Sequence, residues 1–79
     1  VALFPNPSNG IVELLVDTEE GTTVRYSLYD IMGREVENGR YNTSQNGIET
    51  LVLTSLPSGA YVLKVQFGSE THTERIMIE

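Results

Sequence analysis

Short segments of alternating apolar and polar residues, each closed by glycine, asparagine or proline, are the feature that most constrains the fold of this 79-residue chain. A period of two puts apolar side chains on one face of a β-strand. No segment repeats its apolar residues at the spacing of a helix face. The clearest alternation is in residues 60–67, whose apolar face consists of Tyr61, Leu63, Val65 and Phe67. The pattern therefore predicts an all-β fold.

Turn signals divide the chain into about seven such segments. We expect a first edge strand at residues 1–4, and further strands at 11–17, 22–30, 34–37, 48–53, 60–67 and 71–78. Asn38-Gly39 and Asn46-Gly47 are pairs that favour tight turns, and they bracket a polar stretch around Tyr41. About seven short antiparallel strands at this spacing are typical of an immunoglobulin-like β-sandwich with Greek-key connections.

Two of the expected strands differ in their pattern of burial. Residues 11–17 carry apolar side chains on both faces, so we expect this strand to be largely covered on both sides. Residues 22–30 alternate cleanly, so we expect Val24, Tyr26 and Leu28 to face inward in a half-buried strand.

The length of the chain allows one domain, residues 1–79, with one core. A domain of this size buries only ~60% of the surface of its unfolded chain, so a ligand site would have to lie on the surface. The chain begins at Val1 rather than at Met, has no signal-peptide pattern, and has no apolar run long enough to cross a bilayer. We therefore expect a piece of a larger protein that does not insert into a membrane.

Composition excludes several kinds of function. Eleven acidic and five basic residues give a net charge of −6, which disfavours binding to nucleic acid or to anionic membranes. The chain has no cysteine, so disulfides, zinc–thiolate sites and thiol nucleophiles are ruled out. We expect no cofactor and no metal.

An enzymatic function has little support. His72 is the only histidine, and we expect it to be a solvated surface residue without triad partners. Neither a nucleophile elbow nor a phosphate-binding glycine loop is present. Asp17, Glu19 and Glu20 offer carboxylates for calcium, but the EF-hand spacing is missing and a solvated charge run is the favoured interpretation.

Two turns have a specific chemistry. In the segment Leu56-Pro57-Ser58-Gly59-Ala60-Tyr61, a tyrosine follows a Pro/Gly corner at the start of a core strand, which resembles the tyrosine corner of Greek-key proteins. Asp30 is expected to bond to the backbone of its own turn and to brace it with Arg34. We expect Gly33 and Gly59 to be turn glycines with positive φ.

Three motifs together indicate a family. They are Phe4-Pro5-Asn6-Pro7-Ser8-Asn9-Gly10, Leu28-Tyr29-Asp30-Ile31-Met32-Gly33-Arg34-Glu35-Val36 and Leu56-Pro57-Ser58-Gly59-Ala60-Tyr61-Val62-Leu63-Lys64-Val65. In this order, over nearly the whole chain, they resemble the C-terminal sorting domains of the type IX secretion system.

This resemblance implies a non-catalytic signal at the C-terminus of a secreted cargo protein of a Gram-negative cell. Such cargo crosses the inner membrane, folds in the periplasm and is exported through the outer membrane to the cell surface or the medium. The implied partners are the outer-membrane export machinery, the covalently attached upstream cargo, and a surface sortase-like cysteine protease. That protease commonly cuts just before the domain and can join the cargo to an anionic lipopolysaccharide.

The candidate residues form two groups. The residues expected to be recognised by the export machinery or the sortase, or to shape what is recognised, are Asp30, Gly33, Arg34, Pro57, Gly59, Arg75, Ile76, Met77, Ile78 and Glu79. The residues expected to be structural are Pro5, Asn6, Pro7, Gly10, Leu56 and Tyr61. Arg75 stands where the family usually has a lysine, and the two are not equivalent where geometry matters. We expect the last strand to present a free edge, through which the domain could weakly self-associate.

The alternative function is that of an adhesive or carbohydrate-binding sandwich module of a secreted hydrolase. Tyr29 and Tyr41 are the aromatic residues that could stack on sugars if they are exposed. A cross-strand pair or a cover for a sheet edge is the favoured interpretation of these two tyrosines.

Overall fold

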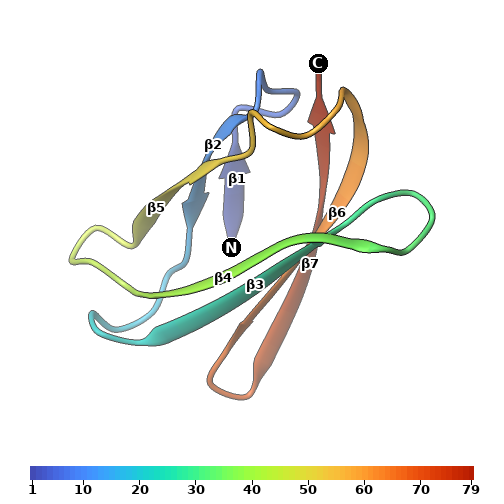
Figure 1. The fold of residues 1–79 in the computed structure, drawn as a ribbon. Coiled ribbons are helices and arrows are strands. Elements are labelled where there is room, and N and C mark those ends of the chain that lie inside the picture. The colour runs from blue at the N-terminus through green and yellow to red at the C-terminus, as the bar shows by residue number, and fades with distance from the viewer.

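The computed structural model describes residues 1–79, which form seven β-strands and no helix (Figure 1). The strands are β1 (Ala2–Phe4), β2 (Ile11–Leu15), β3 (Thr23–Tyr29), β4 (Glu35–Asn42), β5 (Ile48–Val52), β6 (Gly59–Phe67) and β7 (Glu70–Ile78). They form two antiparallel sheets, with the strand orders β1-β2-β5 and β4-β3-β6-β7. The predicted immunoglobulin-like sandwich is confirmed. No helix capable of spanning a membrane is present.

Two of the strand pairings are distant in sequence. β5 pairs with β2 and β6 pairs with β3, so the chain changes sheet between β2 and β3, between β4 and β5, and between β5 and β6. These connections make a Greek key. β3–β4 and β6–β7 are simple hairpins within the larger sheet.

The core lies between the two sheets. Its thirteen buried apolar residues come from both layers: Val12, Leu14, Val16, Val24, Leu28, Leu51, Leu53, Tyr61, Leu63, Val65, Phe67, Ile76 and Ile78. Val24 and Leu28 face inward as predicted, and Tyr26 is half-buried on the same side. The alternation of β6 is confirmed, since its four predicted inward residues all belong to this core.

Antiparallel pairing gathers the turns into two groups. One group, which we call the C-terminal pole, consists of the β1–β2 loop, the β3–β4 turn, the β5–β6 loop and the C-terminus. In Figure 1 the two loops and the C-terminus lie together at the top, and the β3–β4 turn projects to the right of them. The other turns, β2–β3, β4–β5 and β6–β7, lie toward the opposite end. Thr43 pins this second end, because its buried hydroxyl accepts a hydrogen bond from the amide of Thr22 at 3.0 Å and donates one to the carbonyl of Glu19 at 2.7 Å.

The prediction that the second strand is covered on both sides is wrong. Val12 and Leu14 are buried, but Ile11 is 44% exposed and its cross-strand partner Val52 is 63% exposed. The three-stranded sheet has only one sheet packed against it, so its outward face remains open despite its apolar residues.

The prediction of a turn at Asn38-Gly39 is also wrong, because β4 continues through both residues to Asn42. Gly39 lies directly opposite Tyr26, and a Cβ at this position would be 2.5 Å from the Tyr26 hydroxyl oxygen. The glycine therefore makes room for a tyrosine side chain within the sheet rather than closing a turn. Asn46-Gly47 does form the predicted turn, with the Gly47 amide donating to the carbonyl of Ser44 at 3.0 Å.

Candidate functional site

The end of β7 is held by the β1–β2 loop. The side-chain amide of Asn6 donates to the carbonyl of Arg75 at 2.7 Å and accepts from the amide of Met77 at 3.0 Å. The backbone of Ser8 continues this pairing in parallel, donating to the Met77 carbonyl and accepting from the amide of Glu79, both at 2.9 Å. The side chain of Asn6 and the backbone of Ser8 thus take the place of a neighbouring strand along this edge of β7.

The expectation of a free last strand is therefore wrong for its final residues. β6 occupies one edge from Arg75 to Ile78, and the β1–β2 loop occupies the other from Arg75 to Glu79. Ile76 and Ile78 point into the core, whereas Arg75, Met77 and Glu79 are exposed. The backbone of the terminal segment is consequently fixed, and alternate side chains are displayed to solvent.

The tyrosine corner is confirmed. The hydroxyl of Tyr61, a residue only 7% exposed, donates to the carbonyl of Pro57 at 2.6 Å. Gly59 has the expected positive φ, at 155°. Leu56 packs against the core just before the corner, so the β5–β6 loop is anchored at both ends.

A shallow hollow joins the corner to the terminal strand and to the β1–β2 loop. Its volume is about 230 Å³, and it is lined by Asn6, Ala60, Tyr61, Arg75, Ile76 and Met77. Three motifs that are far apart in the sequence therefore contribute to one small surface, which we call the terminal hollow.

Asp30 organises the β3–β4 turn. One of its carboxylate oxygens accepts from the amides of Met32 at 2.9 Å and Arg34 at 3.0 Å, and the other accepts from the Arg34 guanidinium at 2.9 Å. The hydrogen bond from the Arg34 amide is the main reason why the pKa of Asp30 is below its usual value. Gly33 adopts the expected positive φ, at 81°. The expected turn-bracing pair of Asp30 and Arg34 is confirmed.

The tip of this turn carries two residues that sequence reasoning did not select. Ile31 is 81% exposed and Met32 is 75% exposed, so the braced turn holds two apolar side chains in solvent. The signal available in the sequence was an apolar pair between a turn-forming Asp and Gly, where polar residues are more usual.

All the predicted recognition residues lie at the C-terminal pole, in the β3–β4 turn, the β5–β6 loop with the first residue of β6, and the terminal segment. The predicted structural residues lie there too. Pro5 and Pro7 are exposed on either side of Asn6, and Gly10 is buried, with its amide donating to the Ser8 hydroxyl and its carbonyl accepting from the amide of Leu53. The terminal hollow includes Arg75, Ile76 and Met77 but not the Asp30 turn.

The residues considered for other functions do not assemble into a site. His72 is partly exposed, stacks on the ring of Phe67 with centroids 5.4 Å apart, and lies 3.2 Å from a carboxylate oxygen of Glu70. No group of three or more histidine, aspartate or glutamate side chains is arranged to hold a metal ion. Asp17, Glu19 and Glu20 lie in the β2–β3 loop.

The two tyrosines of the carbohydrate hypothesis lie on opposite faces of the larger sheet. Tyr29 faces outward, whereas Tyr41 packs against the core on the inward side, 6.4 Å from the ring of Tyr26. They cannot form a common stacking platform. The buried Tyr41 hydroxyl has no hydrogen-bond partner, and burial together with the nearby Glu49 raises the pKa of Tyr41 to about 12.

A comparison with protein families gives one result. Residues 2–79 match a family model described as a secretion system C-terminal sorting domain. The match covers all seven strands and the whole C-terminal pole. No curated protein matches the sequence.

Proposed function

Because this chain belongs to the family of secretion system C-terminal sorting domains, the targeting signals of type IX secretion, we propose that its C-terminal pole is the surface that the export machinery recognises. The family is a non-catalytic targeting tag that is attached to a cargo protein and leads to export to the cell surface or the extracellular space. For this domain we propose which residues of the tag are recognised and by what route the cargo travels.

The observation that carries this proposal is the fixed conformation of the terminal segment. Hydrogen bonds from Asn6 and Ser8 on one edge and pairing with β6 on the other keep Arg75, Met77 and Glu79 in constant positions. A receptor that binds a preordered segment does not have to order it at the moment of binding, and this favours affinity.

The β3–β4 turn is the second element of the proposed surface. Ile31 and Met32 are exposed, large and held by a braced backbone, and an ordered apolar side chain is a good anchor for a pocket on a partner. Asp30, Gly33 and Arg34 would then shape the turn, while its two apolar residues make the contact.

The position of the first strand suits a tag. β1 runs toward the C-terminal pole, so cargo joined ahead of Val1 would leave the domain away from the proposed recognition surface (Figure 1). Folded cargo would then leave the pole accessible. In this scheme the cargo passes through the periplasm, and a sortase-like protease cuts the exposed connection before the domain at the cell surface.

Fusing the 79 residues to the C-terminus of a reporter with a signal peptide, in a host with the export system, tests the tag itself. We expect the reporter at the cell surface or in the medium, and retention in the periplasm when residues 71–79 are deleted. Retention of the intact fusion in the periplasm would contradict the proposal.

A deletion also removes core residues, so point variants test the recognition surface more sharply. Met77→Ala and the double variant Ile31→Ala/Met32→Ala should retain the reporter in the periplasm while the purified domains keep the wild-type thermal midpoint. Ile48→Ala is the matched control, because Ile48 is an exposed apolar residue at the start of β5, at the end of that strand farther from the C-terminal pole. Export of both test variants at the control level would contradict the assignment of the surface.

A further inference from the structure

Four of the five basic residues of this acidic chain lie on the outward face of the β4-β3-β6-β7 sheet. They are Arg25, Arg40, Lys64 and Arg75, one on each strand. Alternation places them outward, because the residues next to them in β3, β6 and β7 include the buried Val24, Leu63 and Ile76. The fifth basic residue, Arg34, is paired with Asp30 in the β3–β4 turn.

The register arranges these four residues in a diagonal line, which we call the basic stripe. Arg25 lies directly opposite Arg40, Lys64 lies opposite Ser27 two residues further along β3, and Arg75 lies opposite Val62 two residues beyond Lys64. With strands ~4.8 Å apart and residues ~3.4 Å apart along a strand, the stripe spans roughly 20 Å.

No carboxylate lies within ion-pair distance of these four residues. The ion pairs in the molecule are Arg34 with Asp30 and His72 with Glu70, so none includes Arg25, Arg40, Lys64 or Arg75. Two arginines directly opposite each other in an antiparallel pair repel and lower stability. The chain has eleven acidic residues, yet none forms an ion pair with these arginines. Because the observed arrangement lowers stability, a role in binding is favoured.

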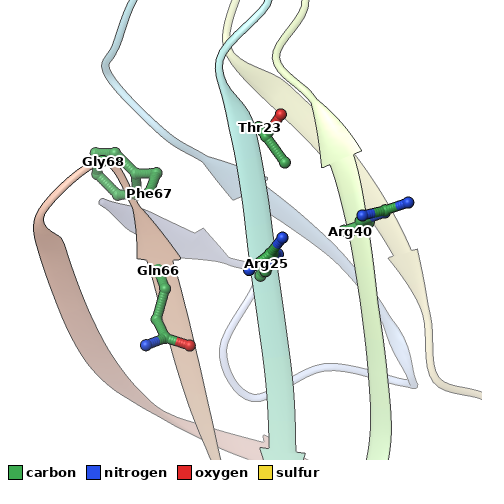
Figure 2. Close-up of a pocket in the computed structure, with 6 residues that line it drawn as sticks. All are labelled: Thr23, Arg25, Arg40, Gln66, Phe67 and Gly68. Carbon is green, nitrogen blue, oxygen red and sulfur yellow. The ribbon is translucent and has the colours of Figure 1, made fainter.

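The end of the stripe that contains Arg25 and Arg40 is hollowed. A depression of about 360 Å³ is lined by Thr23, Arg25, Arg40, Gln66, Phe67 and Gly68 (Figure 2). A neighbouring depression shares Arg25, Arg40 and Gln66 and adds polar groups, including Asn38 and Glu35. Glu35 is held by the Asn38 side chain at 3.1 Å rather than by either arginine. The surface thus offers two guanidinium groups surrounded by side chains that form hydrogen bonds.

We propose that the basic stripe binds an acidic segment of a protein partner in extended conformation. The rows that contain Arg25, Lys64 and Arg75 are ~6.7 Å apart and their strands ~4.8 Å apart, so successive cations are roughly 8 Å apart along the diagonal. This is close to the ~6.7 Å between side chains on one face of an extended chain. Three of the four cations are arginines, whose planar guanidinium group binds a carboxylate through two parallel hydrogen bonds.

The net charge of −6 favours a short anionic ligand over an extended one. At physiological ionic strength, charges are screened beyond ~8 Å, so a short acidic segment on the stripe interacts mainly with the stripe. Nucleic acid and extended anionic membranes reach beyond the stripe and meet the acidic remainder of the surface. Arg75 also belongs to the proposed recognition residues of the C-terminal pole, but Arg25, Arg40 and Lys64 lie outside them. Variants at Arg25 and Arg40 therefore test the stripe separately from the proposed function.

The test is a titration of the 79-residue chain with a capped peptide of about eight residues of alternating Glu and Ser, which extends over roughly 26 Å. At about 50 mM salt we expect saturable NMR shifts of amides in β3, β4 and β6, and weaker binding as salt is raised. Arg25→Gln should lower the affinity about fivefold and Arg25→Gln/Arg40→Gln about twentyfold. Arg34→Gln is the matched control, which removes one charge outside the stripe and should change the affinity less than about twofold.

Several outcomes would overturn the inference. They are unchanged affinity in the Arg25→Gln/Arg40→Gln variant, equal binding of a Gln/Ser peptide, or tighter binding of inorganic phosphate or phosphatidylglycerol vesicles than of the acidic peptide. Loss of repulsion should leave the thermal midpoint of Arg25→Gln unchanged or higher, so a fall in affinity is not caused by unfolding. Arg25→Lys keeps the charge and fold, and it should weaken binding about twofold through loss of the planar guanidinium.

Discussion

Single polar side chains hold the irregular parts of this domain. The turns of the C-terminal pole have backbone hydrogen bonds, and the side chains of Asn6, Asp30 and Tyr61 add further ones. A small domain has a narrow margin of stability, so each of these bonds is a noticeable share of the total. Two predictions follow from the local geometry of these residues.

Tyr61→Phe should lower the free energy of unfolding by ~1 to 2 kcal/mol, because the Pro57 carbonyl loses its hydrogen bond from a largely buried hydroxyl. Urea denaturation followed by circular dichroism measures the change. Tyr29→Phe is the control, since the half-buried Tyr29 makes no side-chain hydrogen bond of this kind. Equal midpoints for wild type and Tyr61→Phe would show that the corner bond contributes nothing.

Asp30 should make stability depend on acidic pH. Its pKa is lowered in the folded state, chiefly by the hydrogen bond from the Arg34 amide, so the unfolded chain binds the proton more tightly. The contribution is therefore present above the unfolded pKa of about 3.9 and is lost as pH falls through the lower folded value. Thermal midpoints measured between about pH 2 and pH 6 should fall less steeply for Asp30→Asn than for wild type. Parallel curves would contradict this role.

Among the elements, β7 differs most from an ordinary edge strand. An exposed edge invites pairing with another chain, and proteins often cover such edges with a loop. Here the cover is the β1–β2 loop, which extends over the residues from Arg75 to Glu79. Weak self-association through the remaining edge of β7 stays a prediction, and it could use only the earlier part of the strand.

Asn6→Ala should release this cover. We expect stability to fall by ~1 to 2 kcal/mol through the loss of two hydrogen bonds, and hydrogen exchange at the Met77 amide to become faster. Asn6→Asp keeps the acceptor for the Met77 amide but loses the donor, so its exchange should be intermediate. Asn9→Ala is the matched control in the same loop, because Asn9 bonds only to the nearby amide of Ile11. Unchanged exchange in Asn6→Ala would show that the loop does not hold the strand.

At the scale of the molecule, one core supports both sheets and hence both proposed surfaces. The C-terminal pole and the basic stripe are built on strands whose inward side chains meet in the same cluster of thirteen residues. A defect in that cluster should therefore disturb the two surfaces together.

Leu63→Ala tests this dependence, because Leu63 is fully buried at the centre of β6. We expect a loss of about 3 kcal/mol, which includes the cost of the cavity and is a large part of the stability of so small a domain. Denaturation should remain a single transition in fluorescence and circular dichroism. Val52→Ala, an exposed substitution, should stay within about 0.5 kcal/mol of wild type. Two separate transitions in Leu63→Ala would show that the sheets unfold independently.

Much of the fold follows from local rules. The alternation of β6, the tyrosine corner and the Asp30 turn each depend on residues a few positions apart, so their geometry is encoded in short segments. The same rules failed at Gly39, whose neighbour across the sheet is Tyr26, and at Ile11, whose exposure depends on the absence of a third layer. Local patterns do not specify which strand or layer lies opposite.

The sequence by itself determined the all-β class, the approximate number of strands and the residues that form the turns, because strand alternation and turn chemistry act over a few residues. Only the tertiary structure decided that Asn6 holds Arg75, 69 residues away, and that four dispersed basic residues line up across one sheet face. Those placements depend on strand order and register, which are set when the apolar faces of the two sheets pack together.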